Sequence, residues 1–305
     1  SGARLSQLIN RKLLYLHPAY ILSSSQRASL LECEFPPKIE EDLTHIRRKR
    51  LTADDGLVCL EDYPYTVSIR LHERHWCGGA IVGRQYVLSA AQNFDYISIE
   101  ELSVRLGSVY RDFGGKLLAV TNIIRHPKYS ITRYYPDHNL ALLKLNIPIS
   151  LSPRVQIVAL PSSETPRLPN YGELVVTGYG AVKSGRIKEG KNQELRRMIV
   201  KEVGKADCRL MYGNDYQIQN DHACLKSVVK HVALCAGDTG DPAVHFTGES
   251  RSGTLLGVAV FSGGEECAFK ERPGIFALID STWVKSVINE SSKNTMNSPE
   301  SLDDE

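Results

Sequence analysis

The sequence CAGDTGDP at residues 235–242 decides the fold of this chain. It places the hydroxyl residue Thr239 among glycines and aspartates, with a cysteine in front and a proline behind. Two other stretches belong with it, LSAAQN at residues 88–93 and NLALLKL at residues 139–145. The three stretches are interpreted together, because one short motif gives only weak support for a fold.

Taken in chain order, the stretches at residues 88–93, 139–145 and 235–242 resemble three segments of chymotrypsin- and trypsin-like serine proteases. Those segments read L-T-A-A-H-C, D-I-A-L-L-K-L and C-x-G-D-S-G-G-P. Gln92 stands at the histidine position, Asn139 at the aspartate position and Thr239 at the serine position. The resemblance covers residues 51–289. It implies an all-β fold of two six-stranded antiparallel Greek-key barrels followed by a C-terminal helix.

The residue patterns agree with this fold class. Residues 65–71 alternate in polarity as a half-buried strand does. Further short β-rich runs are separated by Gly, Pro and Asn, which favours a barrel or sandwich over βαβ units. Residues 283–288 place apolar side chains on one helical face, and Asp280 or Ser281 can cap that helix.

The composition excludes several classes of function. Lys and Arg number 37 against 35 Asp and Glu, a net charge of +2, so nucleic acid is not an expected partner. No apolar run is long enough to span a bilayer. We expect no metal and no cofactor: Ser108 stands where the calcium loop of trypsin has a glutamate, and the cysteines show no C-x-x-C zinc pattern.

The chain is expected to have three parts. Residues 1–50 do not resemble a protease domain and form a propeptide-like extension, and residues 51–289 form the protease-like domain. Residues 290–305 are polar and acidic, so we predict a disordered tail.

The extension ends in the basic sequence RRKR at residues 47–50. This sequence is either a solvated basic run or a processing site. Cleavage after Arg50 would free Leu51 as a new N-terminus. By the resemblance to the family, the ammonium group of Leu51 would then pair with Asp238. The new terminus reads LTAD rather than the family's IVGG, so it departs from the pattern.

Seven cysteines fit an oxidising compartment, and we expect a secreted, extracellular protein. The resemblance implies two disulfide bonds, Cys208–Cys224 and Cys235–Cys267. Three cysteines are left: Cys33, Cys59 and Cys77. We expect Cys33–Cys59, which would keep the extension attached after cleavage, with Cys77 as a buried thiol; Cys33–Cys77 is the alternative.

The three substituted positions argue against the chemistry of the family. The amide of Gln92 does not titrate usefully, so it cannot take a proton from Thr239 as a histidine would. Asn139 supplies no negative charge, and the methyl group of Thr239 crowds the point of attack. We therefore predict that the chain is not an enzyme. The alternative is a weak serine-type endopeptidase that uses Thr239 with an atypical base.

Other positions of the resembled site are partly retained. Backbone N–H groups of Gly237 and Thr239 could form an oxyanion hole. Asp241 replaces a glycine, and its carboxylate would lie near that hole or point to the surface. The resemblance places the specificity pocket at five uncharged positions: Ala233, Ser262, Gly263, Gly264 and Gly274.

A fold without its usual chemistry is expected to act by binding. We expect a secreted cofactor, decoy or regulator in an extracellular proteolytic cascade, immune or reproductive, with active proteases, their substrates or inhibitors as partners. The basic residues within 183–201 form a solvated loop or a site for an acidic polysaccharide or other acidic partner. Asn289 begins an N-glycosylation sequon.

Overall fold

The computed structural model describes residues 58–130, 135–162, 168, 172–181, 194–229, 232–247, 253–261 and 272–296, with side chains as far as Glu290. The chain divides into two units, Ser1–Arg50 and Leu51–Glu305, and every described residue belongs to the second. The predicted extension over residues 1–50 therefore lies outside the described residues, and the predicted domain boundaries stay a prediction.

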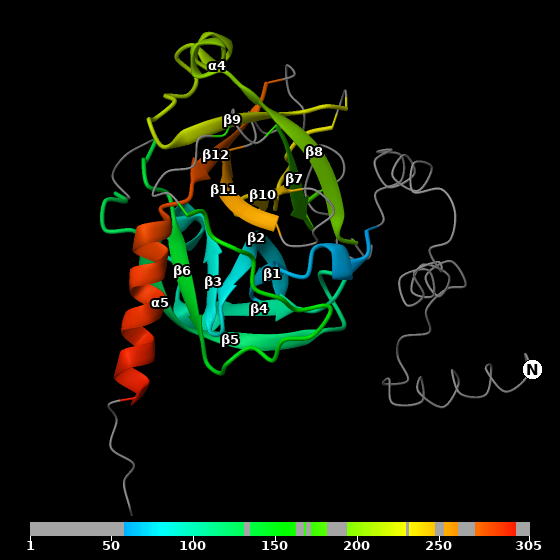
Figure 1. Cartoon of the computed structure of the whole chain (residues 1–305), viewed down its shortest axis with the longest axis vertical. Helices are drawn as coiled ribbons and strands as arrows, with labels where there is room; N and C mark the ends of the chain where they lie inside the picture. Colours follow the sequence, from blue (N-terminus) through cyan, green and yellow to red (C-terminus); the bar gives the residue numbers. More distant parts are fainter. Residues whose placement is uncertain are drawn as a thin grey trace, which may run out of the picture. The chain divides into compact units, whose positions relative to one another are not determined.

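The first barrel is a closed antiparallel sheet with the strand order β1-β2-β3-β6-β5-β4 (Figure 1). Its strands are β1 (Thr66–Leu71), β2 (Arg74–Gly83), β3 (Tyr86–Ser89), β4 (Leu102–Leu106), β5 (Lys116–Arg125) and β6 (Ala141–Leu145). Three short 3-10 helices lie around it: η2 (Leu60–Asp62), η3 (Ala91–Phe94) and η4 (Ile99–Glu101).

The second barrel is also closed and antiparallel, with the order β10-β11-β12-β9-β8-β7. Its strands are β7 (Glu173–Gly178), β8 (Arg196–Val203), β9 (His222–Ser227), β10 (Pro242–Phe246), β11 (Gly253–Phe261) and β12 (Gly274–Leu278). Two six-stranded antiparallel barrels confirm the fold class that the sequence predicted.

The seam between the barrels is itself an apolar core, in addition to one core inside each barrel. Strand β1 shows how this arises. Val67 and Ile69 belong to the core of the first barrel, while Thr66 Oγ1 lies 2.7 Å from Thr177 Oγ1 of β7. Both faces of β1 are thus covered, whereas the alternation predicted a half-buried strand. The second barrel covers the face that would otherwise meet water.

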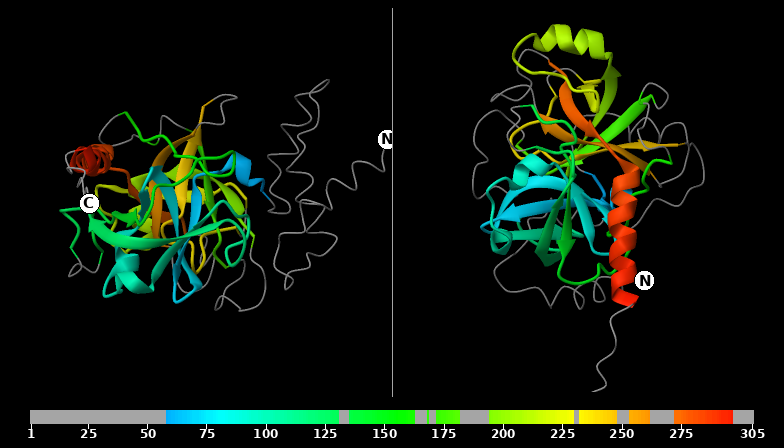
Figure 2. Two further views of the ribbon diagram at one scale, coloured as in Figure 1. Left: turned by 90° about the horizontal axis from the view of Figure 1, so that it is seen from below. Right: turned by 90° about the vertical axis from the view of Figure 1, so that its left-hand side faces the viewer.

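The C-terminal helix α5 (Ser281–Met296) runs beside β6 of the first barrel (Figures 1 and 2). Asp280 caps it as predicted, because the Trp283 N–H donates to Asp280 Oδ1 at 3.0 Å. Val284 is fully buried. The helix reaches residue 296, so the prediction of a disordered tail from residue 290 is wrong for 290–296; the rest of that stretch lies outside the described residues.

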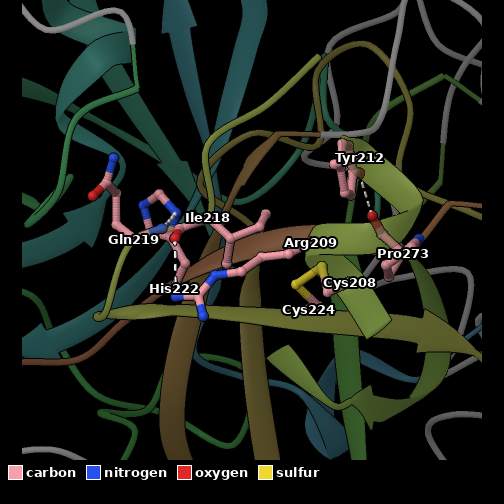
Figure 3. Close-up of a disulfide and its surroundings, with 8 residues drawn as sticks. All are labelled: Cys208, Arg209, Tyr212, Ile218, Gln219, His222, Cys224 and Pro273. Carbon is pink, nitrogen blue, oxygen red and sulfur yellow. Dashed lines mark hydrogen bonds between the residues drawn. A yellow bond between two sulfur atoms is a disulfide. The ribbon is translucent and has the colours of Figure 1, made fainter. Parts of the chain in front are cut away.

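One predicted disulfide bond lies at the outer edge of the second barrel. Cys208 of helix α4 (Lys205–Tyr212) is bonded to Cys224 of β9, with Cα atoms 6.3 Å apart (Figure 3). Nearby, the Tyr212 hydroxyl donates to the Pro273 carbonyl. This pairing is the one that the resemblance implied.

The charged stretch over residues 183–201 is not a loop throughout. Residues 196–201 lie in β8, which pairs with β7 on one side and β9 on the other. The prediction of a solvated loop is therefore wrong for these residues. Residues 183–193 lie outside the described residues.

Candidate functional site

The structure brings Gln92 and Asn139 into direct contact at the seam. Gln92 lies in η3 after β3, and Asn139 lies just before β6. Asn139 Nδ2 donates to Gln92 Oε1 at 2.7 Å, and the Gln92 backbone N–H donates to Asn139 Oδ1 at 3.0 Å. Gln92 Nε2 donates in turn to the Val260 carbonyl at 2.7 Å. We call Gln92 and Asn139 the amide pair.

The amide pair is held without any charge. Each amide has both a donor and an acceptor, so two of them can bond to each other and to a backbone carbonyl at any ordinary pH. Asn139 is completely buried, so its side chain needs hydrogen-bond partners within the protein. Its two hydrogen bonds with Gln92 supply these partners and fix the orientation of the Gln92 side chain. The pair acts chemically as a positioning element rather than as a proton carrier.

Thr239 lies in residues 235–241. We call these residues the nucleophile loop, after the segment that they resemble. The Thr239 carbonyl accepts a hydrogen bond from the Gly78 N–H at 2.9 Å and from Asn93 Nδ2 at 3.4 Å. Asn93 therefore ties the loop to η3 from the position where the resembled family has a cysteine. Cys77, which would have been that cysteine's partner, is a buried free thiol, so the alternative Cys33–Cys77 pairing is wrong.

His75 holds the other side of the nucleophile loop. Its Nε2 lies 3.1 Å from the Gly237 carbonyl, and its Nδ1 lies 2.8 Å from Ser68 Oγ. Burial lowers the pKa of His75 to about 4, so the ring is neutral at pH 7. A neutral ring has one donor and one acceptor, so Nε2–H donates to Gly237 and Nδ1 accepts from Ser68. Gly237 has φ +93°, a conformation that favours glycine.

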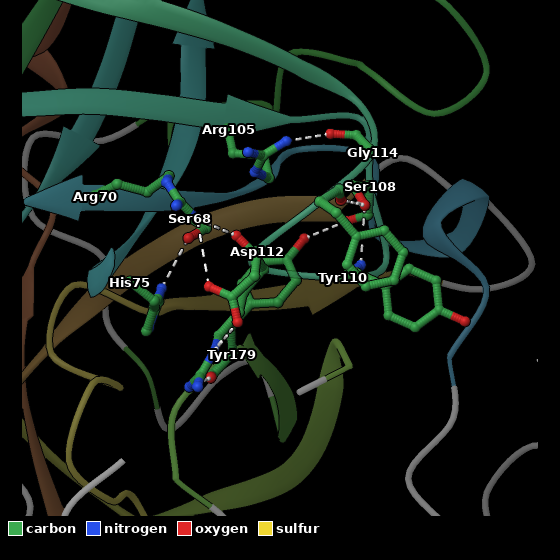
Figure 4. Close-up of polar contacts among 11 residues, drawn as sticks. Ser68, Arg70, His75, Arg105, Ser108, Tyr110, Asp112, Gly114 and Tyr179 are labelled. Atoms are coloured by element: carbon green, nitrogen blue, oxygen red, sulfur yellow. Dashed lines mark hydrogen bonds and ion pairs between the residues drawn. The ribbon is translucent and has the colours of Figure 1, made fainter. Parts of the chain in front are cut away.

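A polar cluster lies behind His75 (Figure 4). Arg70 donates to the Arg111 carbonyl at 2.7 Å, and Arg111 pairs with Asp112 at 3.1 Å. The Tyr179 hydroxyl donates to the Ser108 carbonyl at 2.6 Å. These contacts fix the segment after β4 against the second barrel. Over the residues that the structure describes, no group of three or more His, Cys, Asp or Glu could hold a metal ion.

Asp241 is buried, so the expectation that its carboxyl group points to the surface is wrong, whereas its nearness to the oxyanion hole stays a prediction. The residue is only 1% exposed and its side chain lies between Gly78 and Gly178. Burial raises the pKa of Asp241 well above its usual range, and the neighbouring Asp238 raises it further. Sequence reasoning did not find this, because the two glycines that make room for the carboxyl group come from distant strands.

The predicted specificity pocket is described only in part. Ala233 is partly exposed, and the Leu234 side chain lies over Gly274, with Cδ1 2.6 Å from where a Cβ on that glycine would be. The positions Ser262, Gly263 and Gly264 lie outside the described residues. Leu234 was missed because it is uncharged and belongs to no motif.

Phe261 was also missed. It follows Val260, the acceptor for Gln92, and its ring stacks on Tyr216 with centroids 4.7 Å apart. The run of apolar residues at the end of β11 was the signal, but it was interpreted only as a strand. Phe261 therefore joins the amide pair to an aromatic cluster of the second barrel.

Several predicted features fall on residues outside the described part. Cys59 and Cys235 are both disulfide-bonded. Their predicted partners, Cys33 and Cys267, are not described, so the two pairings stay predictions. The same holds for cleavage between Arg50 and Leu51. The oxyanion-hole role of the Gly237 and Thr239 N–H groups is likewise still a prediction.

Two barrels with loops from both meeting at the seam define the two-barrel serine protease class, and the comparisons agree. A family model described as Trypsin matches residues 60–284. Hypodermin-B of Hypoderma lineatum is 34% identical over 235 residues, which cover 77% of this chain and 84% of that protein. Trypsin of Phaedon cochleariae is 32% identical over 221 residues, 72% of this chain and 80% of that protein.

A solved structure supports the same assignment. Neuropsin, a serine protease expressed in the limbic system of mouse brain, aligns with a TM-score of 0.64 and 25% identity, over 76% of this chain and 98% of that one. The chain belongs to the trypsin-like serine protease family.

These relatives contradict the prediction that the chain is not an enzyme. That prediction rested only on the identities of Gln92, Asn139 and Thr239, whereas the matching relatives are trypsins and hypodermins. At the level that the comparisons reach, the chain is classed with the serine proteases. Among the helices in the described part of the chain, none is long and apolar enough to cross a membrane.

Proposed function

We propose that this member of the trypsin family binds protein segments at the face formed by η3 and the nucleophile loop. On this proposal it is secreted and acts as a cofactor, decoy or regulator in an extracellular proteolytic cascade, immune or reproductive. Its partners are active proteases, their substrates or their inhibitors. The observation that carries the proposal is the pair of exposed aromatic side chains, Trp76 and Tyr96, beside the amide pair.

Trp76 and Tyr96 have the character of interface anchors. The Trp76 indole is 43% exposed, yet its Nε1 donates to the Asn93 carbonyl at 2.7 Å, so the ring is fixed while one face meets solvent. Tyr96 is 92% exposed and lies just after η3. Trp and Tyr are enriched among the residues that dominate binding energy, and a ring already held in place loses little entropy on binding.

The surface beneath these rings is rigid. The amide pair fixes η3 against the loop before β6, and His75 fixes the nucleophile loop at Gly237. A preorganised surface favours affinity because less ordering is left for the binding step.

Binding can be tested with an immobilised Kunitz-type trypsin inhibitor and a panel of active trypsin-like proteases as probes. Trp76→Ala and Tyr96→Ala should each weaken binding by about 30-fold, the usual effect of losing a central aromatic anchor. Leu210→Ala is the matched control, because Leu210 is 81% exposed but lies on α4. Equal loss in the control, or no binding to any probe, would contradict the proposal.

The family itself favours a second candidate, a weak endopeptidase that uses Thr239. Two histidines that were candidates for such a base have other contacts: His75 with Ser68 and Gly237, and His138 with His126, whose ring centroid lies 4.7 Å away. An atypical base would have to come from another group. Hydrolysis of a mixed peptide library that disappears in Thr239→Ala would establish this candidate.

Secretion, glycosylation and polysaccharide binding are part of the proposal. Asn289 is exposed on α5, where an attached glycan would meet solvent. Lys201 Nζ lies 3.2 Å from Glu173 Oε1, so the positive charge of at least one basic residue in the stretch 183–201 is partly neutralised. Retention on heparin that falls with added salt would support a site for acidic polysaccharides.

A further inference from the structure

Asp241 fills a space that glycines from both barrels leave open. A Cβ on Gly78 of β2 would lie 1.8 Å from Asp241 Oδ1, and a Cβ on Gly178 of β7 would lie 1.5 Å from Asp241 Oδ2. Each barrel therefore contributes one glycine to the walls of this space. The carboxyl group is built into the seam.

Asp238 lies in contact with this carboxyl group. Its Oδ2 accepts a hydrogen bond from the Cys235 N–H at 2.6 Å, and its Oδ1 lies 1.9 Å from where a Cβ on Gly180 would be. The Asp241 N–H donates to the Asp238 carbonyl at 3.0 Å, which brings the two side chains close enough to share a hydrogen bond. We call Asp238 and Asp241 the acid pair.

No cation compensates the acid pair within the described residues, since neither carboxyl group is in an ion pair there. The other titratable groups around it are neutral at pH 7. Burial raises the pKa of the Cys77 thiol of β2 and of the Tyr179 phenol after β7, and burial lowers the pKa of His75. A hydrogen bond between two carboxyl groups needs a proton on one of them, and adjacent buried carboxylates cannot both ionise cheaply.

We infer that Asp241 keeps its proton and donates a hydrogen bond to Asp238. This internal donor orders the nucleophile loop in the uncut chain, where the ammonium group that cleavage after Arg50 would free is absent. The pair carries one negative charge in total. The loop of this uncut chain already has its Gly237 carbonyl on His75 and its Thr239 carbonyl on Gly78. The inference concerns order in the loop and does not depend on the proposed function.

The protonation of the pair agrees with the geometry. Burial raises the pKa of Asp238 to about 6, and burial together with Asp238 raises that of Asp241 well above the usual range. At pH 7 Asp238 is therefore the carboxylate and Asp241 the acid. The unpartnered Asp241 Oδ1 is buried against Gly78, where a negative charge would be costly.

Hydrogen exchange tests the order directly. Arg50→Gln keeps the chain uncut and is the background for two variants, Asp241→Asn and Asp241→Gly. Asn keeps an N–H donor to Asp238, so the amides of residues 235–241 should stay protected. Gly removes the donor, so those amides should exchange at least ten times faster while β5 and β6 are unchanged. An unprotected loop in the parent, or a protected loop in Asp241→Gly, would overturn the inference.

The pH dependence of unfolding gives a second test that needs only the conservative variant. A retained proton means that the folded state binds more protons than the unfolded state, so stability falls as pH rises above the usual Asp pKa towards the raised one. Between pH 6.5 and 8, the unfolding constant of the parent relative to Asp241→Asn should rise about tenfold per pH unit. Parallel profiles in urea denaturation would show that Asp241 holds no proton.

Discussion

The amide pair and the acid pair lie on the same seam but differ in what holds them. Gln92 and Asn139 each carry a donor and an acceptor, so their contact needs no proton from solution. Asp238 and Asp241 carry only acceptors when ionised, so their contact exists only while one proton is retained. Two hydrogen-bonded pairs of similar size therefore respond differently to pH, and this difference can be measured.

The space around the acid pair gives the largest expected effect. Gly178→Ala would place a Cβ 1.5 Å from Asp241 Oδ2, so the buried carboxyl group or a strand must move. We expect a loss of about 3 kcal/mol in the free energy of unfolding, measured in urea. Gly204→Ala is the control, because the nearest atom to its Cβ would be 3.9 Å away. Gly178→Ala should be partly rescued by Asp241→Gly; equal losses with and without Asp241 would contradict this account.

His75 should show a pH dependence opposite to that of the acid pair. Its pKa is lowered to about 4, so below the usual histidine pKa the unfolded state binds more protons and stability is lost as pH falls from about 6.5 to 4. The loss should approach about 3 kcal/mol in thermal or urea unfolding. His75→Gln, which does not titrate, should flatten this limb of the profile. An unchanged limb in the variant would mean that another group produces it.

Breaking the amide pair should cost less and should not depend on pH. Asn139→Ala leaves the Gln92 N–H and Oε1 without their buried partner, for a loss of about 2 kcal/mol. Urea denaturation at pH 5 and at pH 8 should give the same difference from the parent. A difference that changes between the two pH values would mean that the pair is coupled to a titrating group.

The smallest effect is expected at Ser68. Ser68→Ala removes the donor to His75 Nδ1 but leaves Nε2 on Gly237, so about 1 kcal/mol should be lost. Exchange of the Gly237 and Asp238 amides should accelerate less than in His75→Ala. If Ser68→Ala releases the loop as fully as His75→Ala does, the hydroxyl rather than the ring holds Gly237.

The fold was predictable because its signals are local and ordered along the chain. The stretches at 88–93, 139–145 and 235–242 and the alternating strands identify the two barrels without any knowledge of packing. Strand β8 was not found, because its charged residues Arg196, Arg197 and Lys201 conceal the apolar positions of a partly exposed strand. The helix boundary at Met296 was missed because a polar sequence was taken as a tail.

The site was less predictable because it depends on contacts between distant segments. The sequence showed that Gln92 and Asn139 occupy linked positions, but not that they bond reciprocally. It gave no means of orienting Asp241, since the space for that side chain is defined by Gly78 and Gly178. Inferring the absence of activity from three residue identities went further than the comparisons allow.

Strand β2 has a consequence for local unfolding. His75, Trp76 and Gly78 are neighbours on this strand, and each bonds a different part of the site: the Gly237 carbonyl, the Asn93 carbonyl and the Thr239 carbonyl. The nucleophile loop cannot leave its place without releasing the Gly78 amide. The loop and this end of β2 should therefore open as one cooperative unit, with shared exchange rates.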